Sequence, residues 1–150
     1  MTSAPSSPPN ALHPDQRDVR SDVALELIFE ALSKGHPQTM IAHGRSMGES
    51  LPSGSEVLLA PMGELRLGQV IAIYEPYERF LIHRVVGIRR DGFFLLKGDA
   101  NPGPDGWFPP TTIRANVYAY KWNARWTHPT YSPPPRVPLW TRLARRLRQK

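Results

Sequence analysis

One serine, one histidine and one aspartate in this chain stand in three distinctive local sequences. Ser46 follows a glycine and an arginine, His83 lies in an apolar run, and Asp105 ends a segment rich in glycine and proline. A serine hydroxyl is a poor nucleophile at neutral pH, so it needs a base within hydrogen-bond reach, and the base needs a third group that fixes its tautomer. These residue types therefore indicate the nucleophilic chemistry of a serine hydrolase.

The sequences around these residues resemble those of a known peptidase superfamily. From about Ile41 to Tyr120 the chain is similar to the catalytic core of type I signal peptidases and LexA-like peptidases, whose members use a lysine or a histidine as base. Because His83 stands at the place of the base, the chain resembles the histidine branch, that of archaeal, endoplasmic-reticulum and sporulation-type signal peptidases. The resemblance implies a serine nucleophile. The matching segments are Gly44-Arg45-Ser46-Met47, His83-Arg84-Val85, Gly98-Asp99-Ala100-Asn101 and Asp105.

Two aspartates compete for the role of the acid. The resemblance implies that Asp105, six positions after the aspartate of the Gly-Asp pair, orients His83. Asp99 follows Gly98 in an expected tight turn that also contains Asn101. Aspartates in such turns commonly accept backbone N–H bonds. These three residues of the turn are therefore expected to be structural and to lie near the site.

The residues beside the nucleophile are expected to line the site. The backbone N–H of Ser46 is the first candidate to stabilise the oxyanion. Some relatives carry a hydroxyl two residues before the nucleophile, but Gly44 stands here, so a second donor must be backbone or come from elsewhere. Gly44 instead permits a sharp turn. Arg45 and Met47 flank the serine, and Met47 either contacts substrate or fills a gap in the core. His43 either lines the site or caps a strand.

Each of these residues also has a purely structural interpretation. Ser46 is of a type common in tight turns, and a backbone carbonyl can satisfy His83 on a half-buried strand. Two departures from the family pattern bear on the same choice: Glu49 stands where proline is usual, and Gln69 stands where aspartate is frequent. The histidines and acids show no recognised metal-ligand spacing, so neither a metal nor another cofactor is expected.

The composition is that of one globular domain with proline-rich ends. The chain has 17 prolines, 11 glycines and no cysteine, which excludes a thiolate nucleophile, a cysteine metal site and a disulfide. No stretch approaches the ~20 apolar residues of a membrane span, and residues 1–14 do not have the pattern of a secretion signal, so a cytoplasmic protein is expected. The expected segments are a disordered N-terminus at 1–20, a catalytic domain at 21–121, an aromatic and proline-rich linker at 122–138 and a helix at 139–150.

Short β-rich runs separated by glycine- and proline-containing turns predict a mostly β domain. Apolar residues at helical spacing predict one N-terminal amphipathic helix. The helix is expected from Ser21, its N-cap, to Lys34, with Gly35 as the stop signal. The Asp91-Gly92 pair predicts a hairpin turn. The resemblance implies a coiled antiparallel β fold of the signal-peptidase type with a substrate groove. The helix face expected to pack on the domain contains Val23, Ala24, Leu27, Ile28, Ala31 and Leu32. The expected strands are 38–42, 56–60, 69–74, 80–89, 93–97 and 113–120.

The formal net charge of +6 comes from the C-terminal end of the chain. From Arg136 onward there are six basic residues and no acid, which leaves 13 basic and 13 acidic residues in the rest. On a short C-terminal helix the apolar and basic residues fall on opposite sides, so this helix either packs on the domain or lies peripherally on the anionic inner membrane surface. Nucleic acid gains little from the apolar side and is not expected as a partner. The expected membrane-contact residues are Leu139, Trp140, Leu143, Leu147, Arg142 and Arg145.

The leading functional hypothesis is a serine endopeptidase of the signal-peptidase-like type, with a polypeptide substrate bound as an added β-strand. The resemblance implies small residues just before the cleaved bond. The alternative hypothesis is a non-catalytic or self-cleaving regulatory module that binds a peptide in the same groove and is tethered by its basic tail. The complete set of Ser46, His83 and Asp105 favours the enzyme. Glu49 and the absence of a spanning segment in the sequence favour the alternative.

Overall fold

The computed structural model of the chain describes residues 19–75 and 79–129, and strands predominate in them. The mostly β fold class with an N-terminal helix is confirmed. In chain order the elements are α1 (Val19–Ser33), β1 (Gln38–Ala42), the 3-10 helix η1 (Gly48–Ser50), β2 (Ser55–Ala60), β3 (Val70–Glu75), β4 (Arg79–Ile88), β5 (Phe94–Lys97), β6 (Gly106–Phe108), the 3-10 helix η2 (Pro110–Thr112), β7 (Ile113–Trp122) and β8 (Arg125–Thr127).

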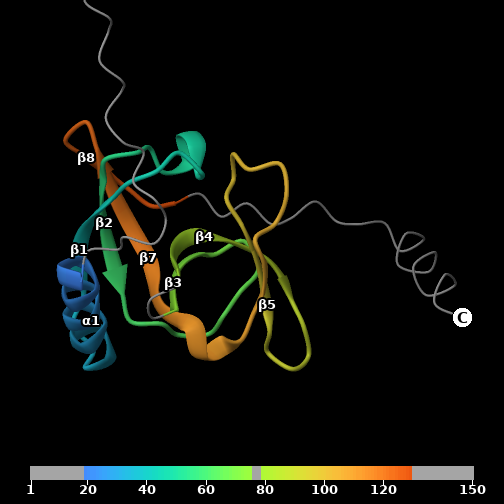
Figure 1. Cartoon of the computed structure of the whole chain (residues 1–150). Helices are drawn as coiled ribbons and strands as arrows, with labels where there is room; N and C mark the ends of the chain where they lie inside the picture. The colour runs from blue at the N-terminus through green and yellow to red at the C-terminus, as the bar shows by residue number, and fades with distance from the viewer. Residues whose placement is uncertain (1–18, 76–78, 130–150) are drawn as a thin grey trace, which may run out of the picture.

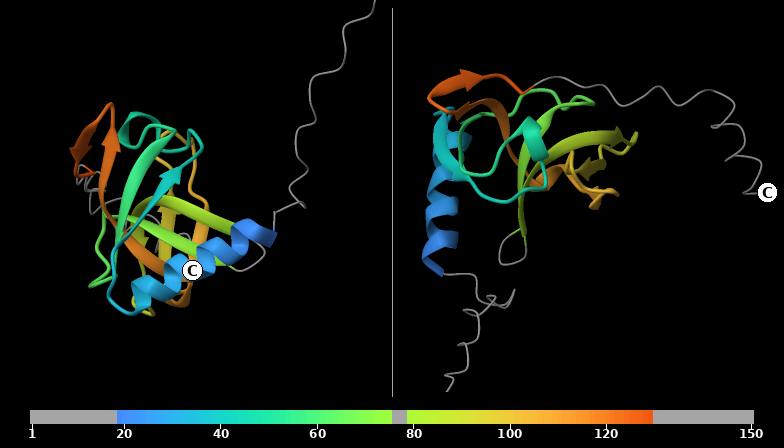
Figure 2. Two further views of the ribbon diagram at one scale, coloured as in Figure 1. Left: turned by 90° about the vertical axis from the view of Figure 1, so that its left-hand side faces the viewer. Right: turned by 90° about the horizontal axis from the view of Figure 1, so that it is seen from above.

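The eight strands form one curled sheet (Figure 1). The strand order is β1-β2-β7-β3-β4-β5-β6, with β8 paired to β7 beside this path, and every pairing is antiparallel. The sheet bends into a half-barrel, and α1 lies along one side of it, in contact with β1 and β7 (Figure 2). Because the sheet is curled, β1 and β4, which are far apart in the strand order, both line one groove.

Two apolar cores lie on opposite faces of β3 because the side chains of a strand alternate between its faces. Val70, Ala72 and Tyr74 enter the first core, which also takes the buried side chains of α1. Ile71 and Ile73 enter the second core, beneath β4, β5 and β6. Strand β3 is therefore buried on both faces, which explains why its sequence is a continuous apolar run rather than an alternating one.

The expected orientation of α1 was wrong in part. The helix begins at Val19, so Ser21 lies inside it rather than at its N-cap. Val23 and Leu27 were expected to face the domain, but they are 55% and 61% exposed. Leu32 is buried as expected, whereas Phe29 was not among the residues expected to face the domain and is buried in the same core. An aromatic ring buries more apolar surface than a valine. The helix therefore turns the face that contains Phe29 towards the core.

Two predicted turn signals are confirmed, and two strands were not predicted. Gly35 follows α1 with a φ of +87°, and Gly92 lies in the turn between β4 and β5 with a φ of +86°. Strands β6 and β8 are only three residues long, and β8 lies inside the range predicted as a linker. Asn123 and Ala124 both adopt positive φ and fold the chain back in a tight turn, so β8 pairs with the end of β7.

The predictions for the two ends of the chain fall largely outside the described residues. These are the predictions of disorder before residue 19, of a linker beyond residue 129, and of a C-terminal helix with membrane-contact residues at 139–150. Within the part of the chain that the structure describes, no helix is both long and apolar enough to cross a membrane.

The docking of α1 depends on one aromatic ring. The Phe29 ring centroid lies 5.2 Å from that of Tyr74 and 5.9 Å from that of Phe80. We expect Phe29→Ala to lower the free energy of unfolding by about 3 kcal/mol, because it removes a buried ring. The exposed Leu27→Ala on the same helix should change it by less than about 0.5 kcal/mol. Urea denaturation of both variants measures the difference, and equal effects would contradict docking through this face.

Candidate active site

Ser46 lies in a tight turn that follows β1. The N–H of Gly44 donates to Ser53 Oγ at 3.3 Å, and the N–H of Gly48 donates to the Arg45 carbonyl at 3.0 Å, so the turn is held on both sides of the serine. Gly44 has a φ of +105°, a conformation that favours glycine and explains the residue two positions before the serine. The local sequence thus presents the hydroxyl at the end of a strand.

His83 lies in β4 and bridges Ser46 and Asp105. Its Nε2 is 2.7 Å from Ser46 Oγ, and its Nδ1 is 2.5 Å from Asp105 Oδ2. The side chain of His83 is 5% exposed and that of Asp105 is 17% exposed. The Asp105 N–H donates to the Leu96 carbonyl at 2.8 Å, which ties the acid to β5. The structure therefore brings together the three residues that the sequence singled out, from three separate segments.

The hydrogen bonds that link Ser46, His83 and Asp105 run in the donor-to-acceptor order that proton transfer requires. An ionised carboxylate can only accept, so Asp105 accepts the Nδ1 proton of His83 and leaves Nε2 of a neutral imidazole as an acceptor. Nε2 can then accept the proton of the Ser46 hydroxyl. This is the arrangement in which a histidine acts as general base for a serine and a carboxylate fixes the tautomer of the histidine.

The second aspartate of the loop, Asp99, pairs with Arg84, and no hydrogen bond of the described residues joins it to His83. Arg84 is 5% exposed, and its Nε and Nη2 donate to the two carboxylate oxygens of Asp99, each at 2.8 Å. Its Nη1 donates to the Gly68 carbonyl at 2.7 Å. Among the described residues, Asp99 thus bonds a guanidinium and the Ser50 side chain, where backbone N–H partners were expected. A bidentate pair of this kind fixes direction as well as distance.

The ion pair with Arg84 governs the charge of Asp99. Partial burial raises the pKa of Asp99, but hydrogen bonds from Arg84 and Ser50 and the positive charges of Arg84 and Lys97 outweigh burial. The pKa of Asp99 therefore lies below its ordinary value of 3.8. Asp99 is ionised at neutral pH, and the charge of the buried Arg84 is matched.

The turn at 98–101 packs directly against the backbone of Ser46. The Ala100 N–H donates to the Ser46 carbonyl at 2.8 Å, and the Asn101 N–H donates to the Gly98 carbonyl at 2.9 Å. A Cβ on Gly98 would lie 2.6 Å from the Ser46 carbonyl oxygen and 2.8 Å from Asn101 Nδ2. These separations are too short for a methyl group, so only glycine fits here. Gly98 and Asn101 therefore lie near the site, as expected.

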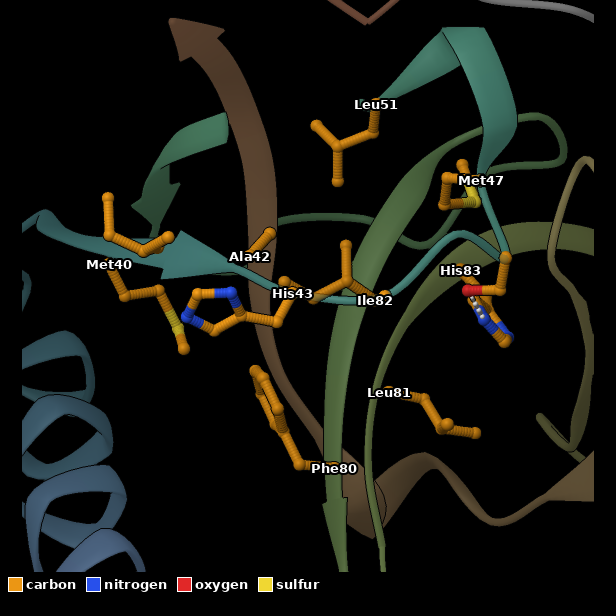
Figure 3. Close-up of a pocket in the computed structure, with 12 residues that line it drawn as sticks. Met40, Ala42, His43, Met47, Leu51, Phe80, Leu81, Ile82 and His83 are labelled. Carbon is orange, nitrogen blue, oxygen red and sulfur yellow. Dashed lines mark hydrogen bonds between the residues drawn. The ribbon is translucent and has the colours of Figure 1, made fainter. Parts of the chain in front are cut away.

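A groove of about 260 Å³ lies between β1 and β4, with Ser46 and His83 in its wall. Figure 3 shows Met40, His43 and Phe80 on one side of it, away from His83. Most of the wall is apolar. The apolar side chains that line it are Met40, Ile41, Ala42, Met47, Leu51, Phe80, Leu81 and Ile82.

The residues beside the nucleophile divide into three groups. Gly44 lines the groove as expected. Met47 is 3% exposed and belongs to the first core while it also borders the groove, so it packs beneath the site. His43 is exposed and lines the groove. Arg45 is exposed and is not among the residues that line the groove.

Three residues that hold the site together were not predicted from the sequence. Arg84 was part of a matched motif, but no partner was assigned to it. The sequence did carry a signal that Arg84 has a partner, because a charged residue in an apolar strand needs a compensating group when it is buried. Ser50 bonds Asp99, and Ser53 accepts the Gly44 N–H. No local pattern marks either serine, since both contacts depend on how the turn folds.

Neither a metal site in the described residues nor a matching family model indicates a function for this chain. Among residues 19–75 and 79–129, no three histidine or acidic side chains are arranged to hold a metal ion. No protein-family model matches the chain, and no curated protein matches it. The geometry of the site is therefore the basis for inferring its chemistry.

The contact between Gly98 and Ser46 predicts a position-specific cost. We expect Gly98→Ala to lower the free energy of unfolding by about 1–3 kcal/mol, because the added methyl group must displace the Ser46 turn. Gly103 lies in the same loop, and a Cβ added there would meet no atom within 4 Å, so Gly103→Ala is the matched control. Its effect should stay within about 0.5 kcal/mol. Equal losses in chemical denaturation would show that the loop does not press on the serine.

The lowered pKa of Asp99 predicts an acid-dependent loss of stability. A depressed folded-state pKa contributes stability above the unfolded-state value, and this contribution is lost as the pH falls through the folded-state pKa. We therefore expect Asp99→Asn to unfold more easily than wild type at neutral pH, with a difference that narrows as the pH falls below 3.8. Asp91→Asn, in an exposed pair with Arg89, should show a smaller difference. A constant difference at all pH values would contradict the assignment.

Proposed function

We propose that this protein is a serine endopeptidase of the signal-peptidase-like type, which cleaves peptide bonds by acyl transfer. The observation that carries the proposal is the hydrogen-bonded chain from Ser46 through His83 to Asp105 in the wall of an apolar groove. A histidine with a purely structural role needs only some hydrogen-bond partner for its ring nitrogens. Here both ring nitrogens are engaged, one by a hydroxyl and one by a carboxylate, as general-base catalysis requires.

In the proposed reaction, Ser46 Oγ attacks the carbonyl carbon of a peptide bond while His83 Nε2 takes the hydroxyl proton. The oxyanion of the tetrahedral intermediate needs preorganised donors. The N–H of Ser46 has no acceptor among the described residues and is available for this role. His83 then gives the proton to the leaving amine, and an acyl-enzyme remains on Ser46. Water attacks this ester with His83 again as the base, while Asp105 stabilises the imidazolium in both steps.

The strand edges beside the groove favour an extended peptide as the substrate. Among the described strands, β1 pairs only with β2, and β4 pairs with β5 only from Arg84 onward. One edge of β1 and one edge of residues 79–83 therefore lack a strand partner in this part of the chain. Both segments line the groove. A peptide that adds as a strand gains main-chain hydrogen bonds and directs alternate side chains into the groove.

The size and lining of the groove favour small apolar side chains beside the cleaved bond. Its volume of about 260 Å³ is below the usual range of roughly 300–1,000 Å³ for ligand pockets. The apolar wall offers few partners to a charged side chain, which would lose its hydration without compensation. A substrate with small apolar residues before the cleavage point is the class that we propose.

The serine and the histidine should act as one unit. We expect Ser46→Ala or His83→Ala to lower turnover of a peptide library by about 10⁴-fold, and the double variant to be little worse than either single variant. Mass spectrometry of the cleaved peptides measures the rates. Losses that multiply in the double variant would mean that the two residues have independent roles, and unchanged rates would exclude this site.

The two aspartates should differ in their effect on rate. Asp105→Asn is expected to lower turnover by about 10⁴-fold, because a neutral amide no longer holds the productive tautomer of His83. Asp99→Asn should cost less once the rates are compared under conditions where both variants are fully folded. Circular dichroism supplies that control. If a folded Asp99→Asn variant is the inactive one, the assignment of the acid is wrong.

A further inference from the structure

A second cavity, of about 440 Å³, lies where β7 meets the start of β3 and the end of β8. Its volume falls within the usual range of roughly 300–1,000 Å³ for small-molecule sites. The proposed peptidase reaction does not use it, and its lining shares no residue with the groove. The lining residues that bear on its chemistry are Arg66, Gly68, Gln69, Asn116, Tyr118 and His128.

A break in the sheet forms this cavity. On one side, β7 pairs with β3 as far as Asn116, and its pairing with β8 resumes only at Tyr120. On the other side, the register with β2 shifts so that Tyr118 is the extra residue of a β-bulge. The Tyr118 carbonyl accepts a hydrogen bond from His128 Nδ1 at 2.8 Å. Bulges are over-represented near functional sites, because they re-aim a side chain and interrupt pairing.

The lining combines an aromatic surface with hydrogen-bond donors. Tyr118 is 54% exposed, and its ring packs edge-to-face on His128 with centroids 4.9 Å apart. Asn116 Oδ1 accepts from Gln69 at 3.1 Å, which leaves the Asn116 amide N–H groups without an acceptor among the described residues. Among the described residues, the Arg66 guanidinium has one ion-pair partner, the exposed Glu64, at 3.4 Å. Such pairs are weak, so the guanidinium remains available to an anion.

We infer that this cavity binds a small planar aromatic carboxylate. Tyr118 and His128 would contact the flat ring, Arg66 would pair with the carboxylate, and the free amide donors of Asn116 would complete its hydrogen bonds. Aromatic side chains prefer offset or edge-to-face contact with another ring. A guanidinium matches the geometry of a carboxylate better than an ammonium group does.

The floor of the cavity is connected to the turn that holds the proposed nucleophile. The Gly68 carbonyl accepts from Arg84 at 2.7 Å, and the Gly68 N–H donates to the Val85 carbonyl at 2.7 Å. Arg84 in turn holds Asp99, whose neighbour Ala100 bonds the Ser46 carbonyl. A ligand that moves Gly68 therefore acts on the Ser46 turn through one buried side chain. Any effect on catalysis rests on the proposed function, whereas binding does not.

Titration of the full-length ¹⁵N-labelled protein with indole-3-acetate, followed by NMR, tests the inference. Indole-3-acetamide lacks the charge and acetate lacks the ring, so both should bind at least about tenfold more weakly than indole-3-acetate. Arg66→Gln and Tyr118→Ala should each weaken indole-3-acetate binding by about tenfold. Arg90→Gln removes another exposed arginine, outside the cavity, and should leave the affinity unchanged.

The titration is repeated on the Ser46→Ala variant, so that the result does not depend on peptidase activity. Shifts centred on Gly68, Asn116 and Tyr118, with a smaller shift at Ala100, are the expected result. Absence of saturable shifts, equal binding of the three probes, or an affinity indifferent to Arg66→Gln and Tyr118→Ala would overturn the site. Saturable binding without any change at Ala100 would overturn the connection to the Ser46 turn and leave the binding site standing.

Discussion

The arrangement of the site depends on the contact between the Ser46 turn and the turn at 98–101. The Ser46 carbonyl accepts the Ala100 N–H, and the approach is so close that a side chain at Gly98 would collide with the serine backbone. Asp105 belongs to the same connecting loop, and its N–H is tied to Leu96. Nucleophile and acid are therefore held relative to each other by backbone contacts, and His83 has only to lie between them.

Electrostatics then assigns a different partner to each acid of that loop. Arg84 takes both carboxylate oxygens of Asp99, while His83 is within hydrogen-bond distance of Asp105. His83 and Arg84 are adjacent in β4, and adjacent strand residues point to opposite faces. The two acids are thus separated by strand alternation. An ionised Asp99 matched by its own guanidinium does not compete for the histidine, so the proposed base keeps a single carboxylate.

Much of this arrangement could be predicted from the sequence, because its signals are local. Short β-rich runs separated by turn residues predicted the main strands, and Asp91-Gly92 predicted a hairpin. The motifs around Ser46, His83 and Asp105 named residues that the structure brings together. Their catalytic role is still a proposal, as is the signal-peptidase-like form of the fold.

What the sequence could not supply depends on contacts between distant segments. Local periodicity could not determine the rotation of α1, because the choice between Leu27 and Phe29 depends on the aromatic rings of β3 and β4. The partner of Asp99 was missed for a similar reason: a turn aspartate has acceptable local partners, and only the folded sheet brings Arg84 to it. Strand β8 is too short to show a period, and its existence depends on a two-residue turn.

The central claim is that His83 and Asp105 activate the Ser46 hydroxyl, and covalent labelling with a fluorophosphonate tests it most directly. Intact mass and peptide mapping of the full-length protein should show a single adduct on Ser46, absent from Ser46→Ala and formed much more slowly in a folded His83→Ala variant. Ser50 and Ser53 lie in the same segment and serve as internal controls, because no hydrogen bond of the described residues joins either serine to His83. An adduct on one of these serines, or a labelling rate that His83→Ala leaves unchanged, would contradict the account.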